Sequence, residues 1–150
     1  MTATTDAPRV STPWHYWLVS VVAILWNAIG AYDYLMSKLG GVAYLKKGGM
    51  TDAQIAHMQA YPVWMTADWA IGVWGGLLGA LLLIARTRYA FHAFVASLAA
   101  FIVMLVYTYV LSDGAQVTGR QGTIFNGVIL ALCIFFVGYA RLMAKRGVLR

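Results

Sequence analysis

Two aspartates lie inside long apolar stretches of this chain, where carboxylates are uncommon. Asp33 is near the end of the first stretch and Asp68 near the start of the second, in a sequence with five acidic residues and no glutamate. An Asp at the centre of a membrane helix costs about 2.5–3.5 kcal/mol, and less near a helix end. We therefore predict a proton- or cation-coupled site, or acceptors for a polyhydroxyl ligand. The alternative is a pair of interfacial groups hydrogen-bonded to Tyr, Trp and backbone.

Other polar side chains fall at a similar depth in the apolar stretches. Asn27 and Gly30 share an arc of the first helix with Asp33, because each step of three residues changes the direction by about 60°. Polar side chains in membrane helices usually face the interior of the bundle. We expect a shallow pocket in the outer half of the membrane, open to the outer side. Its predicted substrate- or proton-binding residues are Asp33, Asp68, Asn27, Asn126, Tyr34 and Tyr107.

The second apolar stretch carries a stripe of glycines on the face that holds Asp68. Gly72, Gly75, Gly76 and Gly79 form two overlapping GxxxG pairs. Small residues at this spacing let helix backbones approach closely, so this face is expected to pack against another helix. Asp68 would then face protein rather than lipid. We assign the same packing role to Gly30 in the first stretch.

Metal, redox and hydrolytic chemistry find little support in the sequence. The three histidines, His15, His57 and His92, lie in separate segments on both sides of the membrane, so they predict no metal site. Cys133 is the single cysteine, which excludes an intrachain disulfide and favours a small apolar filler. No paired transmembrane histidines suggest haem, and no nucleophile–base pair or phosphate-binding motif suggests an enzyme. We expect no cofactor and no catalytic activity.

Four apolar stretches must position these residues. They cover about residues 14–36, 63–85, 88–112 and 122–143, in a chain that is 61% hydrophobic and 11% charged. Each reaches the roughly 20 apolar residues that a helix needs to cross a bilayer. We predict an all-α membrane protein: one four-transmembrane-helix bundle over residues 14–143. A cleaved signal peptide is the alternative for the first stretch, which is long for that purpose.

The connecting segments differ in length and composition. Residues 38–62 form the one sizeable loop, and Thr51 with Gln54 matches a capping box that predicts a short amphipathic helix outside the membrane over residues 51–61. Residues 86–88 make the next connection so short that the second and third helices must be antiparallel neighbours. Residues 113–121 are expected to form a glycine-punctuated turn. We expect a disordered cytoplasmic tail at 1–13 and a basic cytoplasmic tail at 144–150.

The net charge of +6 is divided unevenly between the two sides of the membrane. The side with both termini carries seven cations and the opposite side four, namely Arg9, Arg86, Arg88, Arg141, Lys145, Arg146 and Arg150 against Lys38, Lys46, Lys47 and Arg120. The positive-inside rule therefore places both termini in the cytoplasm. We expect the basic segment from Arg141 to Arg146 to contact anionic head groups of the lipid bilayer, and we expect no nucleic-acid partner.

Three segments of the chain carry a family resemblance: residues 26–34 (Trp-Asn-Ala-Ile-Gly-Ala-Tyr-Asp-Tyr), the predicted helix at 51–61, and residues 62–79, which begin with Pro62 and end with Gly79. The chain resembles a family of small bacterial four-span inner-membrane proteins that are often labelled "sugar transporter". The resemblance covers about residues 14–143 and implies the four-helix fold, the bacterial inner membrane and a sugar as a possible substrate. The chain lacks the paired Pro-Gln signature of half-size sugar transporters and the first-helix Glu of small multidrug transporters.

Two classes of function follow from these patterns. The first is a solute transporter or solute-binding membrane protein, working as a homodimer because four helices enclose little volume, with the glycine stripe as a candidate interface. The second is a non-catalytic accessory subunit that packs on a larger membrane complex. An aqueous pocket between Asp33 and Asp68 favours the first, and a lipid-facing glycine stripe favours the second.

Overall fold

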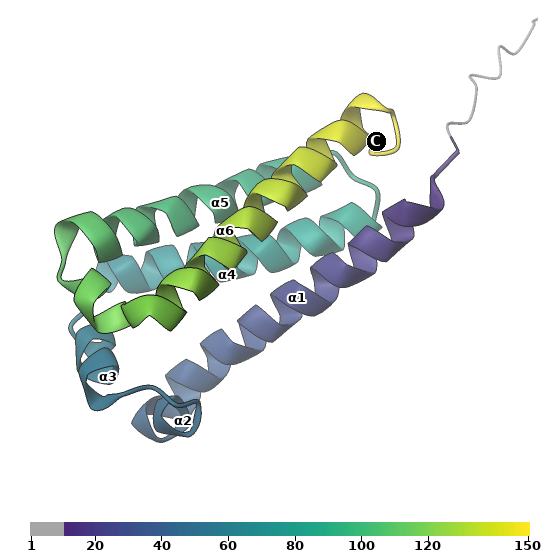
Figure 1. Ribbon diagram of the computed structural model, residues 1–150. Coiled ribbons are helices and arrows are strands. Elements are labelled where there is room, and N and C mark those ends of the chain that lie inside the picture. The colour runs from purple at the N-terminus through teal and green to yellow at the C-terminus, as the bar shows by residue number, and fades with distance from the viewer. Residues whose placement is uncertain (1–10) are drawn as a thin grey trace, which may run out of the picture.

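The computed structural model describes residues 11–150, which form six α-helices and one π-helical turn without a strand (Figure 1). Four of the helices are long and apolar enough to cross a membrane. The chain is therefore a multi-pass integral membrane protein, and the predicted all-α four-helix bundle is confirmed. The spans are α1 (Trp14–Leu39), α4 (Val63–Ile84), α5 (Tyr89–Val106) with the π-helical turn η1 (Tyr107–Leu111), and α6 (Gly114–Lys145). Most of the predicted tail at 1–13, residues 1–10, lies outside the described residues.

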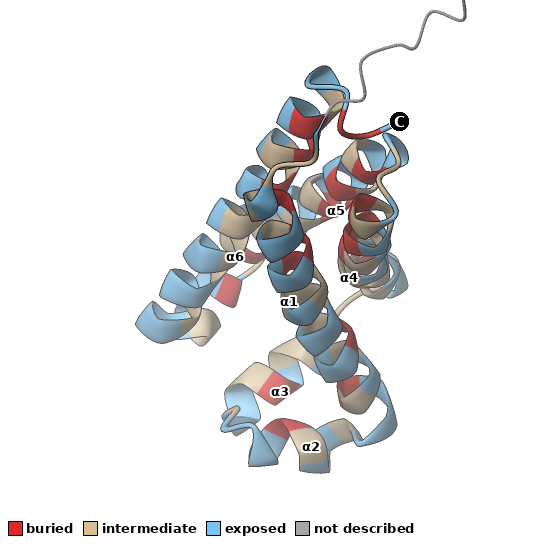
Figure 2. Cartoon of the chain, turned by 90° about the vertical axis from the view of Figure 1, so that its right-hand side faces the viewer, coloured by how far each residue is buried: buried red, intermediate tan, exposed pale blue. Residues whose placement is uncertain are grey.

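The hydrophobic core gathers at the end of the bundle that holds the C-terminus, which we call the base (Figure 2). Tyr16 of α1 is fully buried there, and its hydroxyl donates a hydrogen bond to the carbonyl of Leu83 in α4. Phe94 of α5 stacks on Phe136 of α6 with 5.4 Å between ring centroids. Because all four spans contribute to this cluster, the base of the bundle is closed by close-packed side chains.

The last residues of the chain are docked on the α4–α5 connection rather than extended as a tail. The N–H of Arg88 donates to the Arg150 carbonyl at 3.0 Å, and the N–H of Arg150 donates to the Arg86 carbonyl at 2.8 Å. Val148 and Leu149 are each 1% exposed and belong to the core of the base. The part of the predicted basic tail that follows α6 is thus a structural latch between α6 and the α4–α5 hairpin.

Two short helices connect α1 to α4 at the opposite end of the bundle: α2 (Gly41–Lys47) and α3 (Asp52–Gln59). The predicted capping box of α3 is present, with both hydrogen bonds formed between Thr51 and Gln54. The side chain of Gln54 also donates to the Val117 carbonyl at 3.2 Å, so α3 is fastened to the start of α6. Helix α2 is not foreseen from the sequence, because it is short and starts at Gly41, whose φ is +54°.

The start of α6 differs from the sequence prediction. A turn is predicted over residues 113–121, but α6 begins at Gly114 and continues to the base with one break at Gly119. Gly119 has φ 66° and ψ 179°, a backbone conformation that glycine adopts without a steric penalty. The Ser112 hydroxyl accepts the Gly114 N–H at 3.2 Å, whereas Asp113 at the N-cap position makes no side-chain cap. The hydrogen bond to Ser112 and the contact of Val117 with Gln54 of α3 thus hold this polar, glycine-containing segment in a helical turn.

Candidate functional site

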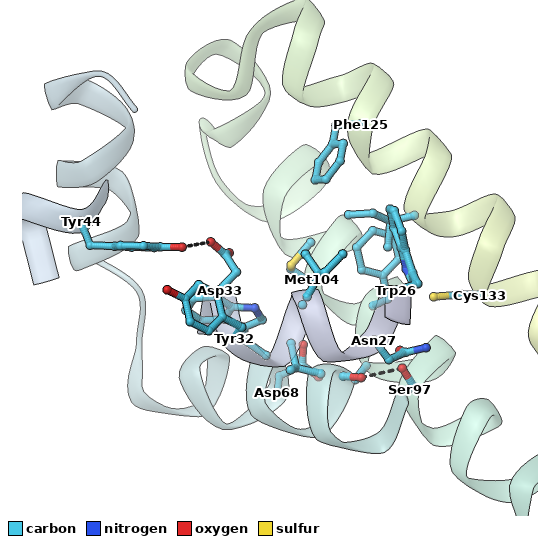
Figure 3. A pocket seen from close by; sticks show the side chains of 18 residues that line it. Trp26, Asn27, Tyr32, Asp33, Tyr44, Asp68, Ser97, Met104, Phe125 and Cys133 are labelled. Carbon is cyan, nitrogen blue, oxygen red and sulfur yellow. Dashed lines mark hydrogen bonds between the residues drawn. The ribbon is translucent and has the colours of Figure 1, made fainter. Parts of the chain in front are cut away.

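A cavity of about 720 Å³ lies between the four spans, displaced from the base toward the α2–α3 end (Figure 3). Side chains of α1, α4, α5 and α6 form its walls, and Tyr44 of α2 adds to the wall at that end. A volume of this size lies in the range typical of small-molecule sites. Asp33, Asp68 and Asn27, which the sequence singles out, all line this one cavity.

Asp33 is the more exposed of the two cavity carboxylates. Its Oδ1 accepts a hydrogen bond from the Tyr44 hydroxyl at 3.0 Å, drawn as a dashed line in Figure 3. The carboxylate of Asp33 raises the pKa of the Tyr44 hydroxyl, chiefly through this hydrogen bond. Tyr44 therefore stays protonated at neutral pH and donates to Asp33.

Asp68 projects from α4 toward the same cavity and has fewer partners. Its Oδ2 atom is buried, and no hydrogen-bond donor reaches it from residues 11–150. Its neighbours in the cavity wall include Trp69 and Gly72 of the same helix. A buried carboxylate oxygen without a donor loses the solvation that it has in water, which is a substantial free-energy cost. Asp68 is thus the group in the cavity that gains most from a cationic or hydrogen-bonding ligand.

Asn27 and Ser97 line the cavity about two turns closer to the base than Asp33. The Asn27 Nδ2 donates to the Ala23 carbonyl at 2.8 Å, and the Ser97 hydroxyl donates to the Gly72 carbonyl at 2.6 Å. A Cβ atom at Gly76 would collide with the Asn27 Oδ1 and approach the Ser97 Oγ to 3.2 Å. Glycine at this position therefore lets α1, α4 and α5 meet at the inner end of the cavity.

The glycine stripe of α4 lies against helices of the same chain. A Cβ at Gly75 would lie 3.5 Å from the Ser97 Cβ, and one at Gly72 would lie 3.7 Å from the Ala100 Cβ. A Cβ at Gly79 would come within 2.7 Å of the Phe94 ring. Because α5 covers this stripe, it does not face lipid and is not free to serve as the homodimer interface that its sequence suggests. Gly30 differs: a Cβ there meets no atom within 4 Å, and the residue lines the cavity.

Tyr34 turns away from the cavity despite its place in the predicted polar arc. Its ring packs edge-on against Trp69 at 4.7 Å and Trp74 at 6.3 Å between centroids. The Lys38 ammonium lies 5.9 Å from the Tyr34 ring centre and 5.3 Å from that of Trp69. Tyr34 therefore joins an aromatic cluster between α1 and α4 that holds Lys38 by cation–π contacts.

Tyr107 and Asn126 also lie outside the cavity wall. Tyr107 packs edge-on between Tyr61 and Trp64, at 5.6 and 5.5 Å between ring centroids. Asn126 donates its Nδ2 to the Tyr109 hydroxyl at 3.1 Å. These side chains join η1 to its neighbours, so the structure gives them positions in helix packing rather than in the pocket. Their predicted depth in the spans therefore did not predict the direction in which these side chains point.

The sequence analysis did not predict the aromatic residues of the cavity wall. Trp26 and Tyr32 of α1, Trp69 of α4 and Phe125 of α6 line it together with the carboxylates. Trp26 and Tyr32 are each one residue before a predicted site residue, and the i, i+3 spacing from Trp26 to Ile29 to Tyr32 was an available signal. Cys133, predicted as a filler, also lines the cavity.

Possible metal ligands are dispersed in the described part of the chain. No three His, Cys, Asp or Glu side chains come together within residues 11–150. His57 pairs with Asp113 at 3.3 Å from Nδ1 to Oδ1, next to the start of α6. His15 is hydrogen-bonded to the Tyr139 hydroxyl at 2.8 Å, at the base. These contacts fasten α3 to α6 and α1 to α6.

No known protein family, curated protein or solved structure matches this chain. The fold and the site together define a class, a four-span integral membrane protein with two carboxylates in an intramembrane cavity. The resemblance to the bacterial four-span family stays a prediction.

Proposed function

We propose that the protein binds a small solute in the cavity and acts as a transporter or solute-binding protein of a bacterial inner membrane. One observation carries the proposal: the cavity of about 720 Å³ contains the Asp68 carboxylate, whose buried Oδ2 has no donor in the described chain. Ionisable groups inside membrane proteins are costly, and they commonly mark a substrate or proton pathway. A packing role alone would be served by an apolar residue at this position.

The position of the cavity supports a site that faces outward. The base, where both ends of the described chain lie, is closed by the core, and the charge distribution assigns this end to the cytoplasm. The cavity lies toward the other end, beside α2 and its Tyr44. Transport would require the base to open, and a path between two copies of the chain is the arrangement that we favour.

A solute screen on the purified chain in lipid nanodiscs tests this proposal. Saturable binding of a member of a panel of sugars, organic cations and amino acids is expected, measured by equilibrium binding. Gly30→Leu should abolish it, because a Cβ at Gly30 meets no atom within 4 Å and Gly30 lines the cavity, so that a leucine side chain there would occupy cavity space. Gly138→Leu is the control, since a Cβ at Gly138 also meets no atom within 4 Å and Gly138 does not line the cavity. Binding that survives in Gly30→Leu would refute the proposed site.

A second candidate, a non-catalytic accessory subunit, is favoured by the poor packing of α6. In the most apolar window of each span, 11% of α6 is buried within the chain, against 22% for α4 and α5. An exposed face of this kind suits lipid or a partner helix. A pull-down in mild detergent at native expression level separates the two. A stoichiometric larger membrane partner, combined with a failed solute screen, would favour the accessory role.

A further inference from the structure

We infer that the cavity takes an amphipathic organic monocation, which enters from the bilayer through the gap between α1 and α6. This inference rests on the proposed function and adds the chemical class of the ligand and its route. Charge, wall composition and the arrangement of the two helices each support it.

The charge of the cavity is negative and has no internal counterion. Asp33 and Asp68 line it, and no Lys, Arg or His belongs to the described residues of its wall. Lys38, the nearest lysine on α1, lies over the ring of Trp69 rather than beside either carboxylate. The ion pairs formed by residues 11–150 involve Asp52 and Asp113 instead. The Asp33 carboxylate has a hydrogen-bond donor in Tyr44, whereas the buried Oδ2 of Asp68 has none, so we expect the positive charge of the ligand to lie beside Asp68.

The rest of the wall is apolar and aromatic. Trp26, Tyr32, Trp69, Phe101 and Phe125 contribute rings, and Ile29, Met104 and Ile129 contribute aliphatic surface. Aromatic faces attract cations and also bury the apolar body of a ligand. A hydrophobic cation would thus pair its charge with Asp68 and place its apolar groups against the rings.

The neutral polar side chains of the cavity offer few free hydrogen-bond donors to a sugar. The amide nitrogen of Asn27 and the hydroxyl of Ser97 already donate to backbone carbonyls of their own bundle. The Tyr44 hydroxyl donates to Asp33. A polyhydroxyl ligand loses water on binding and needs a protein partner for most of its hydroxyls. The wall chemistry therefore favours an organic cation over a sugar.

The two helices that flank the entrance meet at the base and separate beyond it (Figure 2). At the base, Tyr139 of α6 is bonded to His15 and stacks on Tyr16 of α1 at 6.4 Å. Farther along, α1 packs on α4, and α6 packs on α5 and η1. Ile29 and Tyr32 of α1 and Phe125 of α6 line the cavity, yet they are 67%, 61% and 57% exposed. Residues that face both the cavity and the surroundings mark its rim, and those on α1 and α6 are aliphatic and aromatic.

Binding of tetraphenylphosphonium, a hydrophobic monocation, to the full chain in nanodiscs tests the ligand class. Empty nanodiscs correct for partition into lipid. Saturable binding is expected, and Asp68→Asn should weaken it by about tenfold or more, because removing one partner of a buried charge pair is costly. Asp52→Asn is the matched control, since Asp52 pairs with Lys46 outside the cavity and its loss should leave the Kd unchanged. Neutral triphenylphosphine oxide should compete at least about tenfold more weakly on the unmodified protein.

The route is tested with Cys133, which lines the cavity and is the single thiol of the chain. A membrane-soluble maleimide should label it faster than a charged, membrane-impermeant thiol reagent, and tetraphenylphosphonium should protect it. Faster labelling by the charged reagent would overturn the lateral route.

Folded protein without saturable tetraphenylphosphonium binding would overturn the cation inference. If a sugar then binds and Gly30→Leu abolishes that binding, the proposed function stands without the inference; if no probe binds and a stoichiometric partner co-purifies, both fall.

Discussion

Replacing Gly79 by alanine should destabilise the bundle, because the added methyl group has no room. A Cβ at Gly79 would lie 2.7, 2.8 and 2.9 Å from the Cδ1, Cε1 and Cγ atoms of the Phe94 ring. That ring cannot easily move aside, since it is 3% exposed and stacks on Phe136 at an interplanar angle of 19°. Overpacking of this kind costs about 1–3 kcal/mol. For a chain of this size the unfolding midpoint should lie roughly 2–12 °C below that of a glycine-to-alanine variant in which the new methyl group meets no atom.

Gly30→Ala is the matched control for this substitution. It makes the same chemical change in another span, where a Cβ meets no atom within 4 Å. The gain in helix propensity from Gly to Ala, about 1 kcal/mol, is shared by both variants and cancels in their comparison. Thermal unfolding in detergent, followed by the near-ultraviolet circular dichroism of the six tryptophans, measures the difference. Equal midpoints for the two variants would show that α4 and α5 are not in close contact at Gly79.

Three further predictions concern the α3 cap, the C-terminal latch and the cavity acids. Thr51→Ala should destabilise α3 by about 1 kcal/mol, seen as faster amide hydrogen exchange confined to that helix. Leu149→Ala should lower the free energy of unfolding by about 2–5 kcal/mol, whereas Leu142→Ala at an exposed position should change it little. Equal losses would mean that the latch is not formed. Asp68→Asn should weaken cation binding more than Asp33→Asn, since a tyrosine hydroxyl already partners Asp33. The reverse order of dissociation constants would assign the cation to Asp33.

The four spans were predictable because a continuous run of about 20 apolar residues indicates a helix that is surrounded by lipid rather than water. The capping box of α3 was predictable for a different reason, since its two hydrogen bonds are local to Thr51 and Gln54. The start of α6 was not, because the contact of Gln54 with Val117 comes from a segment 63 residues away. Local sequence thus predicted the four spans and α3, whereas a tertiary contact set the start of α6 and the short helix α2 was not predicted.

The cavity was predictable in part. Asn27 and Asp33 share a helix face, and the glycine stripe correctly turned Asp68 toward other helices. Tyr34 was placed on the same arc, but it faces Trp69 because the rotation of α1 is set by its packing on α4. The aromatic walls were missed since tryptophan and tyrosine in membrane proteins usually mark the interface with water. Helix rotation and crossing, which a single sequence does not encode locally, decide which rings line a cavity.

The two ends of the bundle impose a condition on any transport cycle. At the base, the Phe94–Phe136 stack, the buried Tyr16 and the docked Val148 and Leu149 hold all four spans together. An opening toward that side must separate α5 from α6 and release the latch on the α4–α5 hairpin, which exposes apolar side chains. Such exposure is costly in water, and the surface of a second copy of the chain would offset the cost by covering these side chains. A transporting form of this protein is therefore expected to be an assembly, whereas binding in the cavity needs one chain alone.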